Sequence, residues 1–181
     1  MGRDKARLRF GPRSLLGQVR AAARKSGWPA RVIRKDLVTR CGPLGGVYTA
    51  LKTSPADIEL FLACDMPFVT PALLEKLLRN LGRTRQAVFA TLDGTAGFPF
   101  LVRARALPIV ERQIRQKRYS IQALALALRA RLVWLPRRYE MELCNVNTRE
   151  EWERARKWLE TSDGTTDRRL RADKAVRAPG L

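Results

Sequence analysis

Short apolar runs of strand length alternate along this chain with amphipathic stretches of helical period. The clearest runs are residues 58–64 (IELFLAC), 86–90 (QAVFA) and 131–135 (RLVWL), which predict buried strands. Between the first two lies a predicted helix, PALLEKLLRNL, which Thr70 caps and Gly82 ends. Such alternation predicts βαβ units and therefore an α/β fold, a three-layer α/β/α arrangement on a mostly parallel, Rossmann-like sheet.

The weaker patterns complete this outline. They predict helices over residues 14–26, from Pro43 onward, 105–117, 120–130 and 148–159, and strands over 30–35 and 98–102. Pro99 cannot donate a hydrogen bond to a sheet, so it favours an edge position or a bulge. Residues 1–160 are expected to form one domain, and residues 161–181, charged and poor in large apolar side chains, a disordered basic tail.

The cysteine and histidine counts restrict the chemistry. Three cysteines without CxxC spacing, and no histidine, disfavour a disulfide framework, a structural zinc site and any catalytic arrangement that needs histidine. Catalysis would depend on carboxylates, Lys, Arg, backbone amides and a metal. No apolar run approaches the roughly 20 residues that span a bilayer, so we expect a cytoplasmic protein with no membrane partner.

The net charge of +19 raises the question of a polyanionic partner. The basic residues are spread along the chain, and 28 of the 36 are arginine. A solvated basic surface is the favoured explanation, followed by steering of a small anionic substrate. Nucleic acid is the least favoured partner, because no RNP, zinc-finger or basic-zipper pattern is present.

Two polar motifs follow predicted strands or precede predicted helices. Asp65 comes directly after the 58–64 strand, where its carboxylate would project into the ligand crevice and could hold Mg²⁺; the alternative is an Asp that caps the next turn. The CGPLGG turn of residues 41–46 would let a nucleotide approach the backbone at a helix N-terminus. An ordinary strand-to-helix turn would have the same pattern.

Two further motifs could bind ligand. In NVNT, Asn145 and Asn147 lie on one side of a predicted extended segment and could bind ligand, metal or water, although simple turn chemistry also explains them. Near the start, Lys5, flanked by Gly2 and Arg3, could pair with a triphosphate, although surface lysines are common.

Together, in this order, the segments MGRDKARLRFG, GPLGG, ACDMPFV and NVNTREEW resemble the blocks of the molybdenum cofactor guanylyltransferase family within the nucleotidyltransferase superfamily. The resemblance covers roughly residues 1–160. It implies that the phosphate of molybdopterin attacks the α-phosphate of Mg-GTP, which yields the guanine dinucleotide cofactor and pyrophosphate. GTP and molybdopterin would be the substrates, Mg²⁺ the cofactor, and molybdoenzymes the recipients of the product.

The resemblance also implies residue roles. Asp65 would hold Mg²⁺, Lys5 and Arg3 would neutralise the triphosphate, and Asn145 and Asn147 would line the pterin-phosphate side of the site. The implied nucleotide-binding residues are Gly2, Lys5, Asp36, Gly42, Pro43, Leu44 and Asp65.

This sequence departs from the family pattern at two places. The family loop reads approximately LAGGxSxRMGxDK after a first strand, and here only its end is present, so the implied nucleotidyltransferase sheet is N-terminally truncated. Either in-frame codons upstream of Met1 encode the strand, or the chain is a relative that binds GTP poorly. Between residues 26 and 42 the family has two strands, whereas only residues 30–35 fit one.

Three alternatives to guanylyl transfer therefore stay open. The first is cytidylyl transfer to the same cofactor, and the second is nucleotidyl transfer to a sugar phosphate on the same fold. The third is a non-catalytic module that holds the cofactor.

Overall fold

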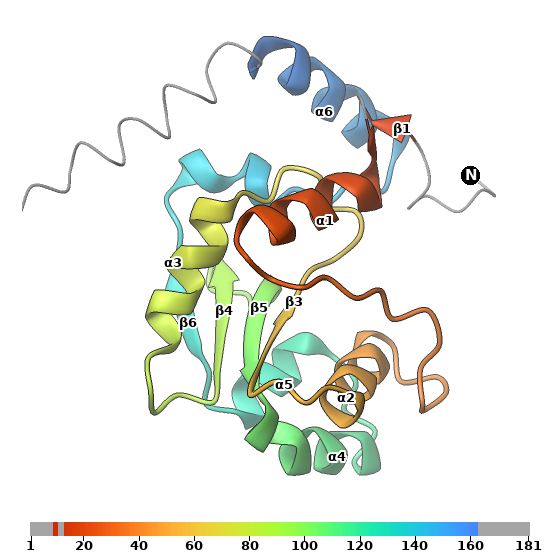
Figure 1. The fold of residues 1–181 in the computed structure, drawn as a ribbon, viewed down its shortest axis with the longest axis vertical. Coiled ribbons are helices and arrows are strands. Elements are labelled where there is room, and N and C mark those ends of the chain that lie inside the picture. Colours follow the sequence, from red (N-terminus) through yellow and green to blue (C-terminus); the bar gives the residue numbers. More distant parts are fainter. Residues whose placement is uncertain (1–8, 11–12, 163–181) are drawn as a thin grey trace, which may run out of the picture.

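A computed structural model describes residues 9–10 and 13–162. Two short strands pair as a hairpin near the N-terminus, and a four-stranded sheet with helices forms the body (Figure 1). The elements are β1 (Arg9–Phe10), β2 (Arg13–Ser14), α1 (Leu15–Lys25), α2 (Pro43–Thr53), β3 (Ile58–Phe61), α3 (Pro71–Leu81), β4 (Ala87–Thr91), β5 (Gly97–Arg103), the 3₁₀ turn η2 (Ala104–Ala106), α4 (Leu107–Arg115), α5 (Ile121–Ala127), β6 (Arg131–Trp134), the 3₁₀ turns η3 (Arg137–Tyr139) and η4 (Met141–Leu143), and α6 (Arg149–Ser162).

The main sheet has the strand order β3-β5-β4-β6. Strand β5 is antiparallel to both its neighbours, whereas β4 and β6 are parallel. The α/β class predicted from the sequence is thus confirmed, but the sheet is mixed. Three strands run in one direction, and the reversed strand lies between two of them, so only one neighbouring pair is parallel.

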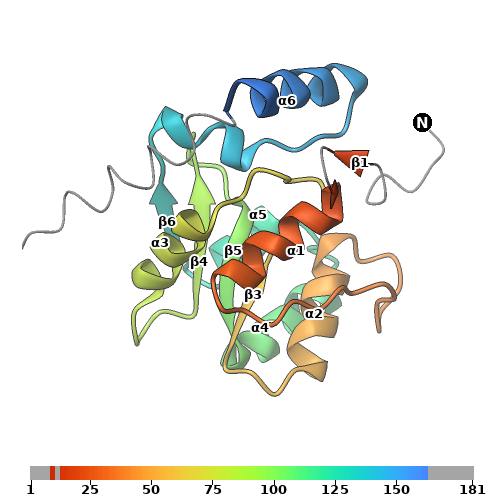
Figure 2. The same cartoon turned by 45° about the horizontal axis from the view of Figure 1, so that its top comes forward.

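Helices cover both faces of this sheet. Alternate residues of β4 separate into two apolar clusters: Val88 and Ala90 pack with the leucines of α3, whereas Ala87 and Phe89 pack with side chains of α2, α4 and α5. Helix α1 contacts α3, and α2 contacts α4, so α1 and α3 share one face and α2, α4 and α5 the other (Figures 1 and 2). The expected three layers are present.

Helix α3 shows how local sequence determines where a helix begins and ends. The Oγ1 of Thr70 accepts a hydrogen bond from the amide of Leu73 at 3.2 Å, and Pro71 occupies the first turn. Gly82, with φ of +58°, ends the helix in a conformation that side chains other than glycine rarely adopt. The helix predicted from residue 71 is therefore confirmed at both ends.

Strand β5 is longer and more central than the sequence indicates. The edge position predicted from Pro99 is wrong, because β5 has a neighbour on each side. The predicted bulge is confirmed: Phe89 pairs with Phe100, but Ala90 pairs with Gly97, so the register shifts across Pro99. Within this irregularity the sheet does not need the N–H that proline lacks.

The prediction of a strand over residues 30–35 is wrong. Residues 28–34 carry no sheet pairing, and the guanidinium of Arg31 donates to Thr53 Oγ1 at 2.7 Å and to the carbonyl of Ala50 at 3.2 Å, at the end of α2. A strand requires a neighbour for its backbone groups. Among the described residues no unpaired strand lies next to this segment.

Strand β3 lies at the edge of the sheet and is the strand with which residues 30–35 could have paired. It comprises four residues rather than the predicted seven, and all four are only half-buried. Its side chains pack on both faces of the sheet, Leu60 with the α3 cluster and Phe61 with the cluster of α2, α4 and α5, but one edge of the strand has no neighbour in the described part of the chain.

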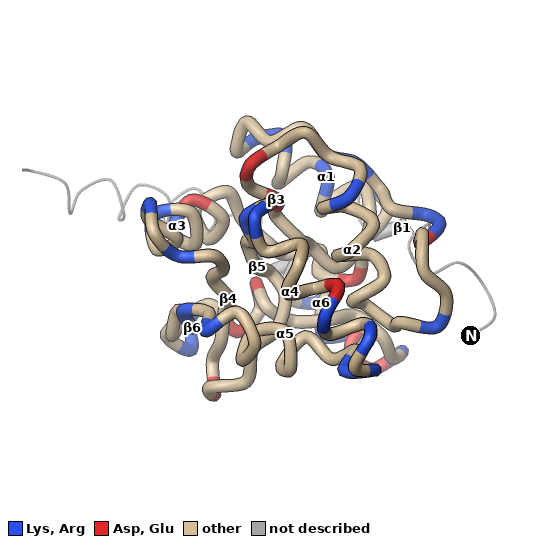
Figure 3. Tube along the Cα trace, turned by 90° about the horizontal axis from the view of Figure 1, so that it is seen from below, with Lys and Arg blue, Asp and Glu red and all other residues tan. Residues whose placement is uncertain are grey.

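Lys and Arg residues are distributed over several helices and loops along the trace (Figure 3), which agrees with the spread seen in the sequence. None of the described helices is long and apolar enough to cross a membrane.

Candidate active site

Two of the predicted site segments, Asp65 and NVNT, meet near the end of the sheet at which β3 ends. Asp65 lies four residues after β3, in the turn that leads to α3. Its backbone carbonyl accepts a hydrogen bond from the amide of Val146 at 2.8 Å. This contact brings the NVNT segment of residues 145–148 against the Asp65 turn, although 80 residues separate them in the sequence.

The carboxylate of Asp65 contains an unsatisfied oxygen. Its Oδ1 atom is buried and has no hydrogen-bond partner among the described residues. A buried acceptor without a partner costs free energy, on the order of 1–3 kcal/mol and more when it is charged. A cation at this position would remove that cost.

The donor set also limits which metal could bind. The described residues contain no cluster of three or more cysteine, aspartate or glutamate side chains, so a site enclosed by protein ligands is absent from this part of the chain. Mg²⁺ commonly uses one or two carboxylates and completes its octahedron with water and substrate phosphates. Asp65 therefore fits a magnesium–nucleotide complex.

A second strand-end carboxylate behaves differently. Asp93 follows β4 at the same end of the strands as Asp65, but its Oδ1 accepts a hydrogen bond from the amide of Thr95 at 2.8 Å. Hydrogen bonds from the backbone and side chain of Thr95 hold the pKa of Asp93 below its ordinary value. The carboxylate of Asp93 thus stabilises the turn that contains it by accepting this local hydrogen bond.

The NVNT segment is held extended by the helix that follows it. Glu151 Oε2 accepts hydrogen bonds from the amides of Asn147 at 2.7 Å and Thr148 at 2.8 Å, and Thr148 Oγ1 accepts one from the amide of Glu151 at 3.1 Å. The two amide donors lower the pKa of Glu151. This capping box leaves Asn145 and Asn147 exposed on either side of buried Val146.

Sequence reasoning missed the positioning role of Glu151. The T-x-x-E spacing of Thr148 and Glu151 is the signature of a capping box and could have revealed it. A second missed contact ties the same region to α3: the hydroxyl of Thr70 donates to Glu142 Oε2 while also capping α3.

None of the three cysteines forms a disulfide bond. Cys41 is buried, Cys64 exposed and Cys144 partly buried. Burial raises the pKa of the Cys144 thiol, so this side chain is less prone than an exposed cysteine to form a thiolate for metal binding.

The glycine-rich turn forms the other side of the site. Gly42 has φ of +52°, and Pro43 begins α2 without a side-chain cap at its N-terminus. The carboxylate of Asp36 lies directly over this first turn: a Cβ atom on Gly45 would be 2.6 Å from Asp36 Oδ2. Leu44 is fully buried and packs in the apolar core, so it anchors the turn and does not face the site.

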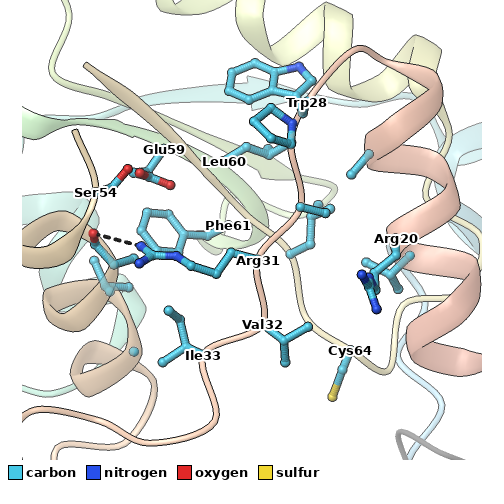
Figure 4. Close-up of a pocket in the computed structure, with 18 of the residues that line it drawn as sticks. Arg20, Trp28, Arg31, Val32, Ile33, Ser54, Glu59, Leu60, Phe61 and Cys64 are labelled. Atoms are coloured by element: carbon cyan, nitrogen blue, oxygen red, sulfur yellow. Dashed lines mark hydrogen bonds between the residues drawn. The ribbon is translucent and has the colours of Figure 1, made fainter. Parts of the chain in front are cut away.

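One cavity lies near these two sides, although Asp65, Asp36 and the NVNT asparagines are not among the residues that line it. It has a volume of about 980 Å³ and runs between α1, α2, β3 and residues 28–34 (Figure 4). Cys64, next to Asp65, lines one part of it, and Pro43 and Gly46 of the glycine-rich turn line another. The structure therefore brings Asp65 together with Asn145–Asn147, and Asp36 with Gly42–Gly46. Gly2, Arg3 and Lys5 lie outside the described residues.

Comparison with known proteins gives a consistent result. The family model for the MobA-like NTP transferase domain matches residues 1–130. A probable molybdenum cofactor guanylyltransferase of Opitutus terrae is 31% identical over 87% of this chain and 89% of its own length. One of Flavobacterium johnsoniae is 30% identical, over 64% of this chain, and the match spans 62% of that relative.

Solved structures show the same fold. Molybdopterin-guanine dinucleotide biosynthesis protein A of Archaeoglobus fulgidus superposes with a TM-score of 0.65 at 21% identity, over 88% of this chain and 92% of that one. A Mycobacterium tuberculosis protein solved as a complex with manganese has a TM-score of 0.59 at 18% identity, over 86% and 93% of the two chains. The resemblance inferred from the four sequence motifs is confirmed.

Proposed function

The chain belongs to the MobA-like NTP transferase family, and from this membership we propose that it transfers GMP from Mg-GTP to the phosphate of molybdopterin. The named relatives support the choice of guanine and of molybdopterin. Pyrophosphate is the second product. Molybdoenzymes in the cytoplasm would receive the completed dinucleotide cofactor.

One observation carries the proposal. Asp65 Oδ1 is buried without a hydrogen-bond partner among the described residues, and the backbone of the same residue is joined to the Asn145–Asn147 segment. A metal–triphosphate at Asp65 would therefore lie next to the two exposed amides. Donor and acceptor phosphates would meet where one carboxylate and two amide side chains are already positioned.

The reaction needs no covalent intermediate. An oxygen of the molybdopterin phosphate attacks the α-phosphorus of GTP, and a new P–O bond forms. The bond from the α-phosphorus to the oxygen that bridges to the β-phosphate breaks, and pyrophosphate leaves with the bonding electrons. Such a displacement depends on alignment and on neutralising negative charge.

Each group of residues has a role in that alignment. Asp65 would hold Mg²⁺, which when bound neutralises charge on the phosphates. Asn145 and Asn147 would donate hydrogen bonds from their amides to the phosphate of molybdopterin. Arg3 and Lys5 would neutralise the triphosphate.

The glycine-rich turn would bind the nucleoside end. Gly42 lets the backbone approach the ligand, and the amides at the start of α2 favour negative charge. The carboxylate of Asp36 can accept hydrogen bonds from hydroxyl or N–H groups of the nucleoside. Pro43 would contribute contacts to the nucleotide, and buried Leu44 would hold the turn in place from the core.

The test is a transfer assay with the purified chain. We expect pyrophosphate release that requires Mg²⁺, GTP and molybdopterin together. Faster release with CTP would reassign the activity to cytidylyl transfer, and release that depends on a sugar phosphate would reassign the acceptor. Saturable binding of molybdopterin without any pyrophosphate release would identify a cofactor-holding module and overturn the proposal.

A further inference from the structure

The turn that carries Asp65 and the segment that leads into NVNT lie beside each other and run in opposite directions. The carbonyl of Asp65 accepts a hydrogen bond from the amide of Val146 at 2.8 Å, and the hydroxyl of Thr70 donates one to Glu142 Oε2. Thr70 follows Asp65 in the chain, whereas Glu142 precedes Val146. Two hydrogen bonds therefore join the turn of residues 65–70 to the segment of residues 142–146, one near each end.

Asn145 lies between these two hydrogen bonds. Its neighbour Val146 is buried and packs in the same apolar cluster as Phe68, which belongs to the turn. The side chain of Asn145 is exposed. Its position relative to Asp65 thus depends on how the backbone on either side of it is held.

The backbone between Glu142 and Asn145 is tightly wound. The amides of Leu143 and Cys144 each donate to the carbonyl three residues earlier in the chain, both at 3.2 Å. Such successive turns leave little freedom between neighbouring residues. A displacement of Glu142 would therefore be passed on to Asn145.

The hydroxyl of Thr70 has two roles at once. Its oxygen accepts a hydrogen bond from the amide of Leu73 at 3.2 Å, which caps α3, and its proton is donated to Glu142. A hydroxyl offers one donor and two lone pairs, and an ionised carboxylate can only accept. Capping needs only the oxygen of Thr70, so the donated hydrogen bond serves the link to Glu142.

We propose that Glu142 is a positioning residue for nucleotidyl transfer, which through Thr70 fixes Asn145 relative to Asp65. The hydrogen bond between Asp65 and Val146 alone would hold one point and leave the segment free to pivot about it. The inference rests on the proposed function, in which Asn145 binds the acceptor phosphate and Asp65 the metal. Misplacement of a reacting group by about 1 Å can cost on the order of 100-fold in rate.

Kinetics of substituted chains test the role. Glu142→Ala should lower kcat for pyrophosphate release by about tenfold or more, because donor and acceptor phosphates lose alignment. The KM for GTP should stay within about twofold, since Asp65 is retained. Glu142→Gln keeps an oxygen that accepts from Thr70, so its kcat should stay within about threefold of that of the unsubstituted chain. If Glu142→Gln loses as much activity as Glu142→Ala, the link to Thr70 is not the cause and the proposal is wrong.

Ser120→Ala is the matched control for general loss of stability. Ser120 Oγ caps α5 by accepting a hydrogen bond from the amide of Ala123 at 3.1 Å, on the other face of the sheet from α3. This variant also loses one side-chain hydrogen bond, so its Tm should fall while kcat is unchanged. Equal losses of kcat in Ser120→Ala and Glu142→Ala would overturn the positioning role.

Amide hydrogen exchange gives a second readout that needs no substrate. In Glu142→Ala, exchange at the amide of Val146 should accelerate by about tenfold, because the segment opens more often. The amide of Leu124, which donates to the carbonyl of Ser120 at 3.1 Å, serves as an internal reference and should not change. Unchanged exchange at Val146 would overturn the inference. Absence of pyrophosphate release from the unsubstituted chain would instead overturn the proposed function, and exchange at Val146 would then decide alone whether Glu142 positions the segment.

Discussion

The two sides of the sheet differ in how completely they are built. On the β4 side, the five residues of β4 are all buried and paired on both edges. On the β3 side, four half-buried residues face a cavity of about 980 Å³. The candidate site residues gather around the β3 side. The closed side stabilises the fold, and the open side provides room for ligands.

The two strand-end aspartates show the same contrast on a smaller scale. Asp93, after β4, has its carboxylate bound by the turn that contains it. Asp65, after β3, retains a buried oxygen without a partner among the described residues. Position at the end of a strand is therefore not enough to define a ligand, because local hydrogen bonding decides whether the carboxylate is available.

The largest expected effect tests packing on the two sides. Phe100 is fully buried and stacks on Phe89 and Phe61, with ring centroids 4.5 and 4.9 Å apart. Phe100→Ala should lower the free energy of unfolding by about 3–5 kcal/mol, and Phe61→Ala, at the half-buried edge, by less than half of that. Urea denaturation measures both. Equal losses of unfolding free energy in the two variants would contradict the difference between the two sides of the sheet.

The second prediction compares catalysis after substitution of the two aspartates that follow β3 and β4. Asp65→Asn should reduce the rate of pyrophosphate release on the order of 100-fold, because the charge that holds the metal is removed. Asp93→Asn, the matched control, should leave the rate within about twofold. If both variants retain full activity, Asp65 does not hold a catalytic metal.

The third prediction distinguishes two adjacent glycines on the open side. Alanine at Gly45 would place its Cβ 2.6 Å from Asp36 Oδ2, whereas at Gly46 the nearest Asp36 oxygen is 3.8 Å away. The exposed Asp36 side chain can rotate aside, so Gly45→Ala should weaken GTP binding about fivefold, close to 1 kcal/mol. Gly46→Ala should bind GTP normally. Calorimetric titration compares them, and equal affinities would remove Asp36 from the nucleotide site.

The smallest expected effect is a pH dependence at the capping box. The folded-state pKa of Glu151 lies below its ordinary value of 4.5, so the stabilisation is present above that value and is lost as pH falls through the folded-state pKa. Glu151→Gln should lower Tm slightly at pH 7 and not at all near pH 3. Thermal unfolding at both pH values checks this, and a constant difference would contradict the assignment.

Much of the fold could be predicted because its signals are local. Thr70 and Gly82 mark both ends of α3, and Ser14 and Ser120 cap α1 and α5 through side-chain hydrogen bonds three residues along the chain. The strands of residues 86–90 and 131–135 were found from apolar runs alone. These patterns involve neighbours within one turn or one strand, so the sequence contains the complete information.

Most of the errors arose where an element depends on a distant partner. Residues 30–35 have strand composition but no neighbour to pair with, and β5 lies inside the sheet despite Pro99 because the register shifts there. The position of Glu151 against Asn147 was missed although its T-x-x-E signal is local. The proximity of Asp65 to the NVNT segment could not be derived from spacing, because 80 residues intervene.

The sequence by itself determined the α/β class, both ends of α3 and the residue types available for chemistry, since propensity, capping and periodicity act over a few residues. Only the tertiary structure decided which strand lies at the edge, which of two strand-end aspartates keeps an unpartnered oxygen among the described residues, and that a cavity beside β3 is lined by both the glycine-rich turn and Cys64. Those outcomes depend on backbone pairing and packing between segments far apart in the chain, where each group's partner is set by the whole fold.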